Sequence, residues 1–211
     1  MTSLNPVMKI GRQVGENLEL HTELTREEIR ERSAQALEQV GLSEPEELLE
    51  RYPHELSGGM RQRVMIAQAM IAAPRLLIAD EPTTALDVIV QAQILKLLRR
   101  IHEEQNTSIL FISHDLNVIR EICDRVLVIY KGVIVEEGEV SQVLNHPQHE
   151  YTKRLVASIP QAVRDTESGK EILNISHLDV FYREGGGIFK KPSKTHVPCD
   201  ANGTVKEGEI L

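Results

Sequence analysis

Hydrophobic positions in the first half of the chain recur at the spacing of amphipathic helices. Residues 26–40 place their apolar side chains near one face, with Thr25 suited to begin a helix and Gly41 suited to end it. Residues 60–72 and 88–101 show the same periodicity. The apolar face of residues 26–40 contains Ile29, Ala36, Leu37 and Val40, and the predicted core positions of residues 88–101 are Ile94, Leu95, Leu97 and Leu98. The pattern predicts three helices, and the alternative for the first is a charged, solvated helix with no special role.

The short apolar run at residues 76–79 predicts a buried strand of a parallel sheet, because such strands are covered on both faces. Residues 109–112 predict a second apolar strand that ends at the same edge of the sheet. Asp80 and Glu81 follow the first run, and His114 follows the second. Helix-like and strand-like segments alternate here, which is the pattern of an α/β core. Ligands bind at the carboxyl edge of such sheets, so we expect these three side chains to face one ligand. Taken alone, the acidic pair is more often a solvated turn and the histidine is more often structural.

The segment LSGGMRQR, residues 56–63, leads into the second predicted helix. Ser57 would place a hydroxyl and unpaired backbone N–H groups at a helix N-terminus, where partial positive charge favours a phosphate. Gly58 and Gly59 have no side chain and let a phosphate approach the backbone. The alternative is that Ser57 is simply an N-cap with flexible glycines beside it.

Four segments follow one another at fixed distances along the chain. They are LSGGMRQR (56–63), LLIADEP (76–82), ALD (85–87) and SHD (113–115). In this order they resemble the signature, Walker B, D-loop and switch-histidine segments of an ATP-binding-cassette (ABC) ATPase. The resemblance implies that the ligand is ATP, bound with Mg²⁺. The nucleotide-binding residues that it implies are Ser57, Gly58, Gly59, Gln62 and Asp87.

The resemblance also assigns chemistry to the ends of the two strands. Asp80 would hold Mg²⁺ through its water shell, and Glu81 would polarise the water that attacks the γ-phosphate. His114 would touch the γ-phosphate and orient the same water. The 211 residues contain no Gly-x-x-x-x-Gly-Lys-Ser/Thr loop, the segment that would wrap the phosphates in the same subunit. The chain is therefore expected to supply half of an ATP site and to be inactive alone.

Further segments resemble one group of ABC ATPases, the subunits that drive di- and oligopeptide importers and related nickel and glutathione systems. They are MTSLNP (1–6), RYPHE (51–55), the stretch from NHP to YT (145–152) and SIP (158–160). This resemblance implies an ATPase for import of peptides or related small solutes, peripheral on the cytoplasmic face of the inner membrane. The implied partners are a second cassette, integral membrane permease subunits and, indirectly, a substrate-binding protein.

The C-terminal part resembles the start of another cassette. Residues 172–182 resemble its first strand, with Tyr182 where an adenine-stacking aromatic lies, although such a tyrosine is more often ordinary packing. Residues 185–192 resemble the variable loop of a partner-type cassette, and residues 205–211 resemble the strand that leads into its phosphate loop. The whole chain thus resembles the central slice of a tandem double-cassette ATPase, with one phosphate loop before it and the next after it.

The predicted fold class is α/β: a partial P-loop NTPase with a helical subdomain and a parallel-sheet core, plus the N-terminal β segment of a second cassette. The predicted parts are a helical subdomain with the signature (1–73), the C-terminal half of a RecA-like core (74–140), a peptide-importer extension (141–160), a linker (161–171) and the second cassette's start (172–211).

Composition narrows the classes of function. A formal net charge of -8 argues against a nucleic-acid-binding surface, and no apolar run approaches the length of a membrane span. The two cysteines, Cys123 and Cys199, imply no disulfide framework. Two alternatives stay open. One is a truncated product without activity, and the other is a non-transport ABC protein of DNA repair, chromosome maintenance or translation, although the long insertions of that class are not visible.

Overall fold

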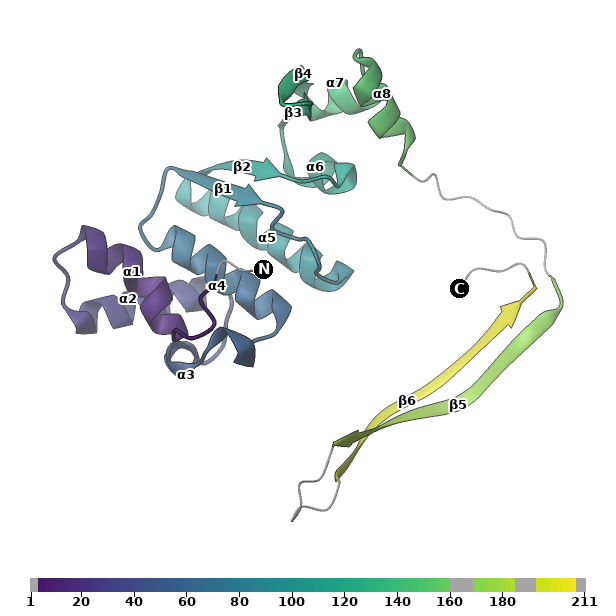
Figure 1. The fold of residues 1–211 in the computed structure, drawn as a ribbon, viewed down its shortest axis with the longest axis horizontal. Coiled ribbons are helices and arrows are strands. Elements are labelled where there is room, and N and C mark those ends of the chain that lie inside the picture. Colours follow the sequence, from purple (N-terminus) through teal and green to yellow (C-terminus); the bar gives the residue numbers. More distant parts are fainter. Residues whose placement is uncertain (1–3, 160–168, 185–192, 208–211) are drawn as a thin grey trace. The chain divides into compact units, whose positions relative to one another are not determined.

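The structure is a computed structural model that describes residues 4–159, 169–184 and 193–207, without the side chains of residues 182–199. The chain divides into two compact units, Met1–Ile159 and Pro160–Leu211. The first unit combines helices and short strands, and the second is a strand pair (Figure 1).

The first unit begins with a group of helices, in which local capping sets the helix ends. Its elements are α1 (Ile10–His21), α2 (Arg26–Gln39), α3 (Pro45–Glu50), a 3-10 turn (Pro53–Glu55) and α4 (Gly58–Met70). At the start of α2, the Thr25 hydroxyl accepts from the Glu28 N–H at 3.3 Å, and the Glu28 carboxylate accepts from the Thr25 N–H at 2.7 Å. Beyond its end, Gly41 has a φ of 76°. The helix predicted at residues 26–40 is therefore confirmed.

One hydrophobic core joins these helices to the sheet that follows. Its fully buried members include Ile10 and Leu37 from the helical group and Ile94 and Leu98 from α5 (Val88–Gln105). Leu77 of the sheet lies in the same cluster. The four core positions predicted in α5 are all buried. The helical group and the sheet are thus packed as one body around shared apolar side chains.

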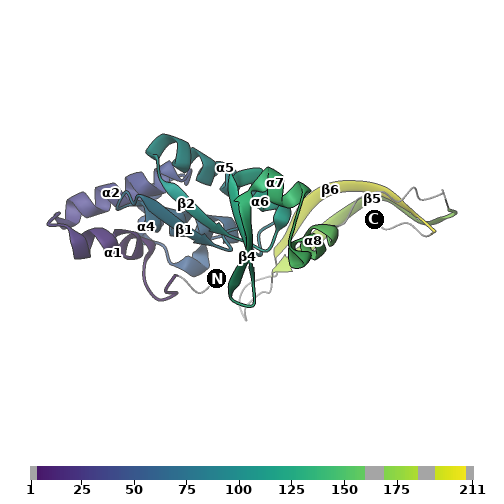
Figure 2. The same ribbon diagram turned by 90° about the horizontal axis from the view of Figure 1, so that it is seen from above.

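Two parallel strands, β1 (Leu76–Asp80) and β2 (Ser108–Ile112), form the sheet, and α5 connects them. Their register pairs Leu76 with Ser108 and Asp80 with Ile112, so their carboxyl ends are level. Figures 1 and 2 show α4 and α5 on one side of this pair.

The prediction that residues 76–79 form a strand buried on both faces is wrong for the described residues. Leu77 and Ala79 are buried, but Leu76 and Ile78 are 53% and 60% exposed, as are Leu110 and Ile112 at 43% and 45%. Successive side chains of a strand point to opposite faces, so one face of the sheet packs on the helices and the other is open. An apolar run alone does not say how many faces are covered.

The remainder of the first unit has its own small core. It contains α6 (Leu116–Ile122), the antiparallel strands β3 (Arg125–Tyr130) and β4 (Val133–Glu139), α7 (Val140–Asn145) and α8 (Glu150–Ala157). Six side chains form the core: Ile119, Val126, Val128, Val140, Val143 and Leu144. The Glu136 carboxylate accepts from the Gln148 N–H at 2.8 Å and the His149 N–H at 3.0 Å. These bonds tie the start of α8 to β4.

The second unit is one antiparallel pair, β5 (Glu171–Glu184) and β6 (Ser193–Lys206). The sequence predicts short strands here, whereas each strand has 14 residues, with register shifts along the pair. Ile172 and Leu173 are 64% and 50% exposed. The predicted variable loop, residues 185–192, and the end of the predicted strand at 208–211 lie outside the described residues.

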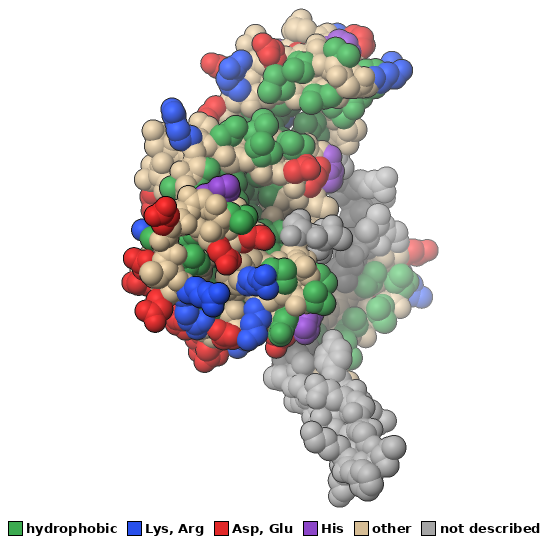
Figure 3. Space-filling view, turned by 60° about the vertical axis from the view of Figure 1, so that its left-hand side comes forward, with side chains coloured by type: hydrophobic (Ala, Val, Ile, Leu, Met, Phe, Trp, Pro, Cys, Tyr) green, Lys and Arg blue, Asp and Glu red, His purple; other side chains and the backbone are tan. Residues whose placement is uncertain are grey.

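Charged side chains of both signs are interspersed on the face of the molecule drawn in Figure 3. In the helical group, for example, the Glu50 carboxylate is 2.8 Å from the Lys9 ammonium and 2.6 Å from the Arg30 guanidinium. Exposed pairs of this kind contribute little to folding free energy. Apolar packing is the main source of stability for these helices.

Candidate functional site

The carboxyl ends of β1 and β2 bring together the residues that the sequence singled out as catalytic. Directly after β1, the Glu81 N–H donates to the Ile112 carbonyl at 2.9 Å, which extends the pairing by one residue. Glu81 has a φ of 47°, a left-handed conformation that a non-glycine residue seldom adopts. This turn places Glu81 beside the segment after β2 that carries His114. Such strain is typical of functional sites.

The Glu81 carboxylate has a bonding partner on each oxygen. His114 Nδ1 is 2.8 Å from Glu81 Oε1, and the His114 backbone N–H donates to the same oxygen at 3.2 Å. The Thr84 hydroxyl donates to Glu81 Oε2 at 2.6 Å. Three contacts from two segments therefore fix the orientation of this carboxylate. We call Asp80, Glu81, Thr84 and His114 the strand-end site.

These bonds shift the acid–base properties of both ionisable partners. The hydrogen bond from Thr84, and after it the bond from His114, lowers the pKa of the Glu81 carboxyl below its ordinary 4.5. The hydrogen bond to Glu81 raises the pKa of the His114 imidazole above its ordinary 6.5. The His114 side chain is 78% exposed and that of Glu81 is 36% exposed. The pair can therefore exchange protons with water while holding a fixed geometry.

Asp80 is the last residue of β1, and it is exposed. No group of three or more His, Cys, Asp or Glu side chains suited to hold a metal occurs among the described residues. Mg²⁺ commonly uses only one or two protein carboxylates together with water and substrate phosphates. A single exposed carboxylate at a strand end therefore suits Mg²⁺ bound with a nucleotide, and does not suit a metal held by protein ligands alone.

The signature residues lie at the N-terminus of α4. The Ser57 hydroxyl accepts from the Met60 N–H at 3.2 Å, so Ser57 is the N-cap of α4. Gly58 and Gly59 form the first turn, and Gln62 lies one turn further and is partly buried. Asp87 has a matching place at the start of α5, where its carboxylate accepts from the Val90 N–H at 2.9 Å.

Tyr182 and Thr84 differ in how they relate to the predicted site. Tyr182 lies in β5 of the second unit, and its side chain is outside the described residues. Thr84 was missed from the sequence. The signal that would have found it is a hydroxyl three residues after an acid in a turn that contains Pro82, where short polar side chains often bond locally.

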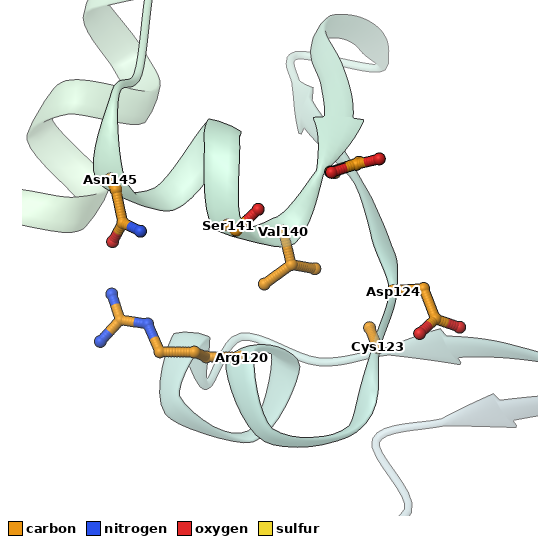
Figure 4. A pocket seen from close by; sticks show the side chains of 7 residues that line it. Arg120, Cys123, Asp124, Val140, Ser141 and Asn145 are labelled. Carbon is orange, nitrogen blue, oxygen red and sulfur yellow. The ribbon is translucent and has the colours of Figure 1, made fainter.

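A hollow of about 400 Å³ lies elsewhere in the first unit, between α6 and α7. Arg120 from α6 points across it toward Asn145 of α7 (Figure 4). Cys123 lies at its wall, and burial, followed by the charge of Asp124, raises the pKa of the thiol above its ordinary 9.0. A thiol of this kind stays protonated near neutral pH and is a poor nucleophile. The hollow therefore adds no reactive group to the strand-end site.

Comparison with known sequences identifies relatives along most of the chain. The ABC transporter family model matches residues 2–84. The peptidoglycan transport ATP-binding protein YejF of Agrobacterium fabrum is 58% identical over 161 residues, which cover 76% of this chain and 30% of that protein. The glutathione import ATP-binding protein GsiA of Escherichia coli K12 is 53% identical over 161 residues, covering 76% of this chain and 26% of that protein. The chain spans less than a third of the length of these relatives.

Solved structures of ABC cassettes are similar to this chain as well. The dimeric ATP-binding cassette MJ0796 bound to ADP and Pi matches with a TM-score of 0.58 and 31% identity, over 65% of this chain and 59% of that one. The cbiO1 protein of Clostridium perfringens, part of the cbiONQ ABC transporter complex, matches with a TM-score of 0.58 and 28% identity, over 75% and 60%. The chain therefore belongs to the ATP-binding proteins of the ABC transporter family. The predicted family and the predicted α/β fold class are confirmed.

No helix in the part of the chain that the structure describes is both long enough and apolar enough to cross a membrane.

Proposed function

We propose that this chain supplies the water-activating and signature parts of the ATP sites in an ABC transport ATPase. The observation that carries the proposal is the Glu81 carboxylate, held on one oxygen by His114 and on the other by Thr84 at the carboxyl edge of two parallel strands. This edge is where ligands bind in sheets of this kind. A fixed carboxylate there is suited to orient one water molecule for attack on a phosphate.

In the proposed mechanism, Glu81 accepts a hydrogen bond from the attacking water and polarises it toward the γ-phosphate of ATP. His114, whose pKa is raised by Glu81, holds a proton that can hydrogen-bond a phosphate oxygen. Thr84 keeps the carboxylate from rotating. Asp80 would hold Mg²⁺ through water, and the ion would neutralise phosphate charge.

The signature residues serve a second phosphate site in this proposal. Ser57, Gly58 and Gly59 lie at the N-terminus of α4, where backbone N–H groups and partial positive charge suit the phosphate of ATP held by a partner cassette. Gln62 and Asp87 lie close in sequence to the same two helix starts and would contact the same nucleotide. The solved relative described as a dimer bound to ADP and Pi supports pairing of two cassettes.

The names of the relatives support a proposal for the assembly and its cargo. Proteins named for glutathione import and peptidoglycan transport support a role in import of peptides or related small solutes. A relative that is part of an ABC transporter complex supports assembly with further subunits. We propose that these are integral membrane permease subunits and, indirectly, a substrate-binding protein. The proposed location is therefore peripheral, on the cytoplasmic face of the membrane. The start of a second cassette at residues 172–211, with Tyr182 near adenine, belongs to the same proposal.

The experiment places residues 1–159 into an ABC ATP-binding protein that carries a phosphate loop, in exchange for its matching segment. Glu81→Gln in this chimera should keep ATP binding and lower the turnover number by roughly 10²- to 10⁴-fold, the range for losing a positioned acid–base group. Glu103→Gln, on the exposed end of α5, is the matched control and should leave turnover unchanged. Wild-type turnover by Glu81→Gln would exclude Glu81 as the water-polarising base.

A further inference from the structure

The two helices that begin at the signature and at Asp87 touch at their first turns. A Cβ built on Gly59 of α4 would lie 2.6 Å from Val90 Cγ1 of α5, and 3.7 Å and 3.8 Å from its Cγ2 and Cβ. Real Cβ atoms essentially never come within 3.0 Å of a heavy atom that lies outside their own residue, its chain neighbours and the adjacent helix backbone. Gly59 is helical, so its backbone conformation is open to any residue. Glycine is therefore required here by space and not by its backbone angles.

Val90 has little freedom to make room for a side chain at position 59. Its N–H is the donor to the Asp87 cap, and its side chain packs against the core cluster that contains Val64 and Ile94. A valine in a helix has one strongly preferred side-chain rotamer. One turn further along α4, the Arg63 guanidinium donates to Gln93 Oε1 of α5 at 3.1 Å, so the two helices stay in contact. A displacement of Val90 would therefore move the start of α5, including Asp87.

We infer that Gly59 is a positioning residue that sets the spacing between the signature serine and Asp87 through its contact with Val90. Ser57 caps α4 two residues before Gly59, and Asp87 caps α5 through Val90 itself. The two helix starts are thus linked by the contact between Gly59 and the Val90 side chain. Ser57 and Asp87 are the groups that would face a partner's nucleotide. The distance between them would therefore decide whether both can contact that nucleotide at the same time. The catalytic consequence rests on the proposed function, whereas the packing does not.

A double-mutant cycle, in which a larger side chain at position 59 is paired with a smaller one at position 90, tests the packing of Gly59 against Val90 in the 211-residue chain. The variants are Gly59→Ala, Val90→Ala and the double variant, and the readout is hydrogen exchange of the Val90 amide measured by NMR. Gly59→Ala should speed this exchange at least about fivefold, as expected when one capping bond is weakened. Val90→Ala removes both methyl groups that the new Cβ would meet, so the double variant should return to within about twofold of the Val90→Ala value. The matched control is Val88→Ala, a truncation in the same turn at a side chain that is 82% exposed, which should give no rescue.

The same cycle in the phosphate-loop chimera tests the consequence for the reaction. Gly59→Ala should lower the turnover number about tenfold or more, and the double variant should regain most of it. If Gly59 served only to let a phosphate approach the backbone, Val90→Ala would not restore turnover, and the inference would be overturned. Unchanged Val90 exchange in Gly59→Ala would overturn it as well. An inactive parent chimera would count against the proposed function alone, because the exchange cycle still decides the packing.

Discussion

The strand pair at the candidate site and the strand pair of the second unit differ in what supports them. β1 and β2 have five residues each, and α4 and α5 cover one of their faces. β5 and β6 have 14 residues each, yet no helix belongs to the described part of their unit. Long strands supply many backbone hydrogen bonds, but an isolated two-stranded ribbon is marginal in water. We therefore expect burial, and not strand length, to make the strand pair at the candidate site the more rigid of the two.

Hydrogen exchange on the whole chain should show the largest effect of this difference. The amides of β2, at 108–112, should be protected at least about a hundredfold more than those of β5 at 172–181, because exchange reports the free energy of local opening. Pairing within the hairpin is interrupted by register shifts. Mass spectrometry of peptides from the two segments is the measurement. Equal protection would mean that the hairpin is supported by contacts beyond its own pairing.

Core truncation is the next largest effect. Leu98→Ala, at a fully buried position of α5, should lower the free energy of unfolding of the first unit by about 2–5 kcal/mol. Leu173→Ala makes the same chemical change at a side chain that is 50% exposed and should cost less than about 1 kcal/mol. Denaturant unfolding followed by the helical circular-dichroism signal measures the first, and NMR of β5 amides follows the second. Equal costs at the two positions would contradict the comparison.

Local signals explain which parts of this structure could be predicted. Thr25 caps the start of α2 and Gly41 follows its end, and both act through residues close by in the chain. The local sequence pattern is therefore enough to predict the bounds of this helix. The juxtaposition of Glu81 and His114 could also be expected, because parallel strands bring their carboxyl ends to one edge. These are properties of neighbouring residues or of sheet topology.

The missed features depend on non-local packing or on backbone detail. Leu76 and Ile78 are exposed because no described element covers that face of the sheet, and the apolar run is the same whether or not something does. The turn residues after Glu81 indicate that Thr84 can bond locally, but they do not indicate the left-handed conformation of Glu81 that accompanies its bond to the Glu81 carboxylate. The contact between Gly59 and Val90 joins two helices far apart in the chain, so no periodicity indicates it.

A smaller effect should follow from removing one hydrogen bond that orients the Glu81 carboxylate. Thr84→Val in the phosphate-loop chimera removes the donor to Glu81 Oε2 and should lower turnover about ten- to a hundredfold, the range for one hydrogen bond to a charged group. Thr84→Ser keeps the hydroxyl and should recover most of the activity. Full turnover by Thr84→Val would show that His114 alone is enough to hold the carboxylate.

The smallest effect concerns the protonation of His114 at the strand-end site. The strand pair of the second unit contains another exposed histidine–carboxylate pair for comparison. Like His114 and Glu81, His177 Nδ1 is close to a carboxylate, 2.6 Å from Asp200 Oδ1, but both side chains are more than 70% exposed. NMR titration should give His114 a pKa above 6.5, and Glu81→Gln should lower it, whereas Glu103→Gln should not.

The sign of the pH dependence follows from the two shifts. Because the His114 pKa is raised on folding, its contribution to stability is complete below pH 6.5 and is lost as pH rises through the folded value. Because the Glu81 pKa is lowered, its contribution is present above pH 4.5 and is lost as pH falls through the folded value. The pair should therefore stabilise the strand ends most between about pH 4.5 and 6.5. Denaturant midpoints of wild type and Glu81→Gln, compared from well below pH 4.5 to above the folded pKa of His114, test it. The difference should be largest inside the range and shrink on both sides of it, and a difference that does not vary with pH would show that the pair does not couple protonation to folding.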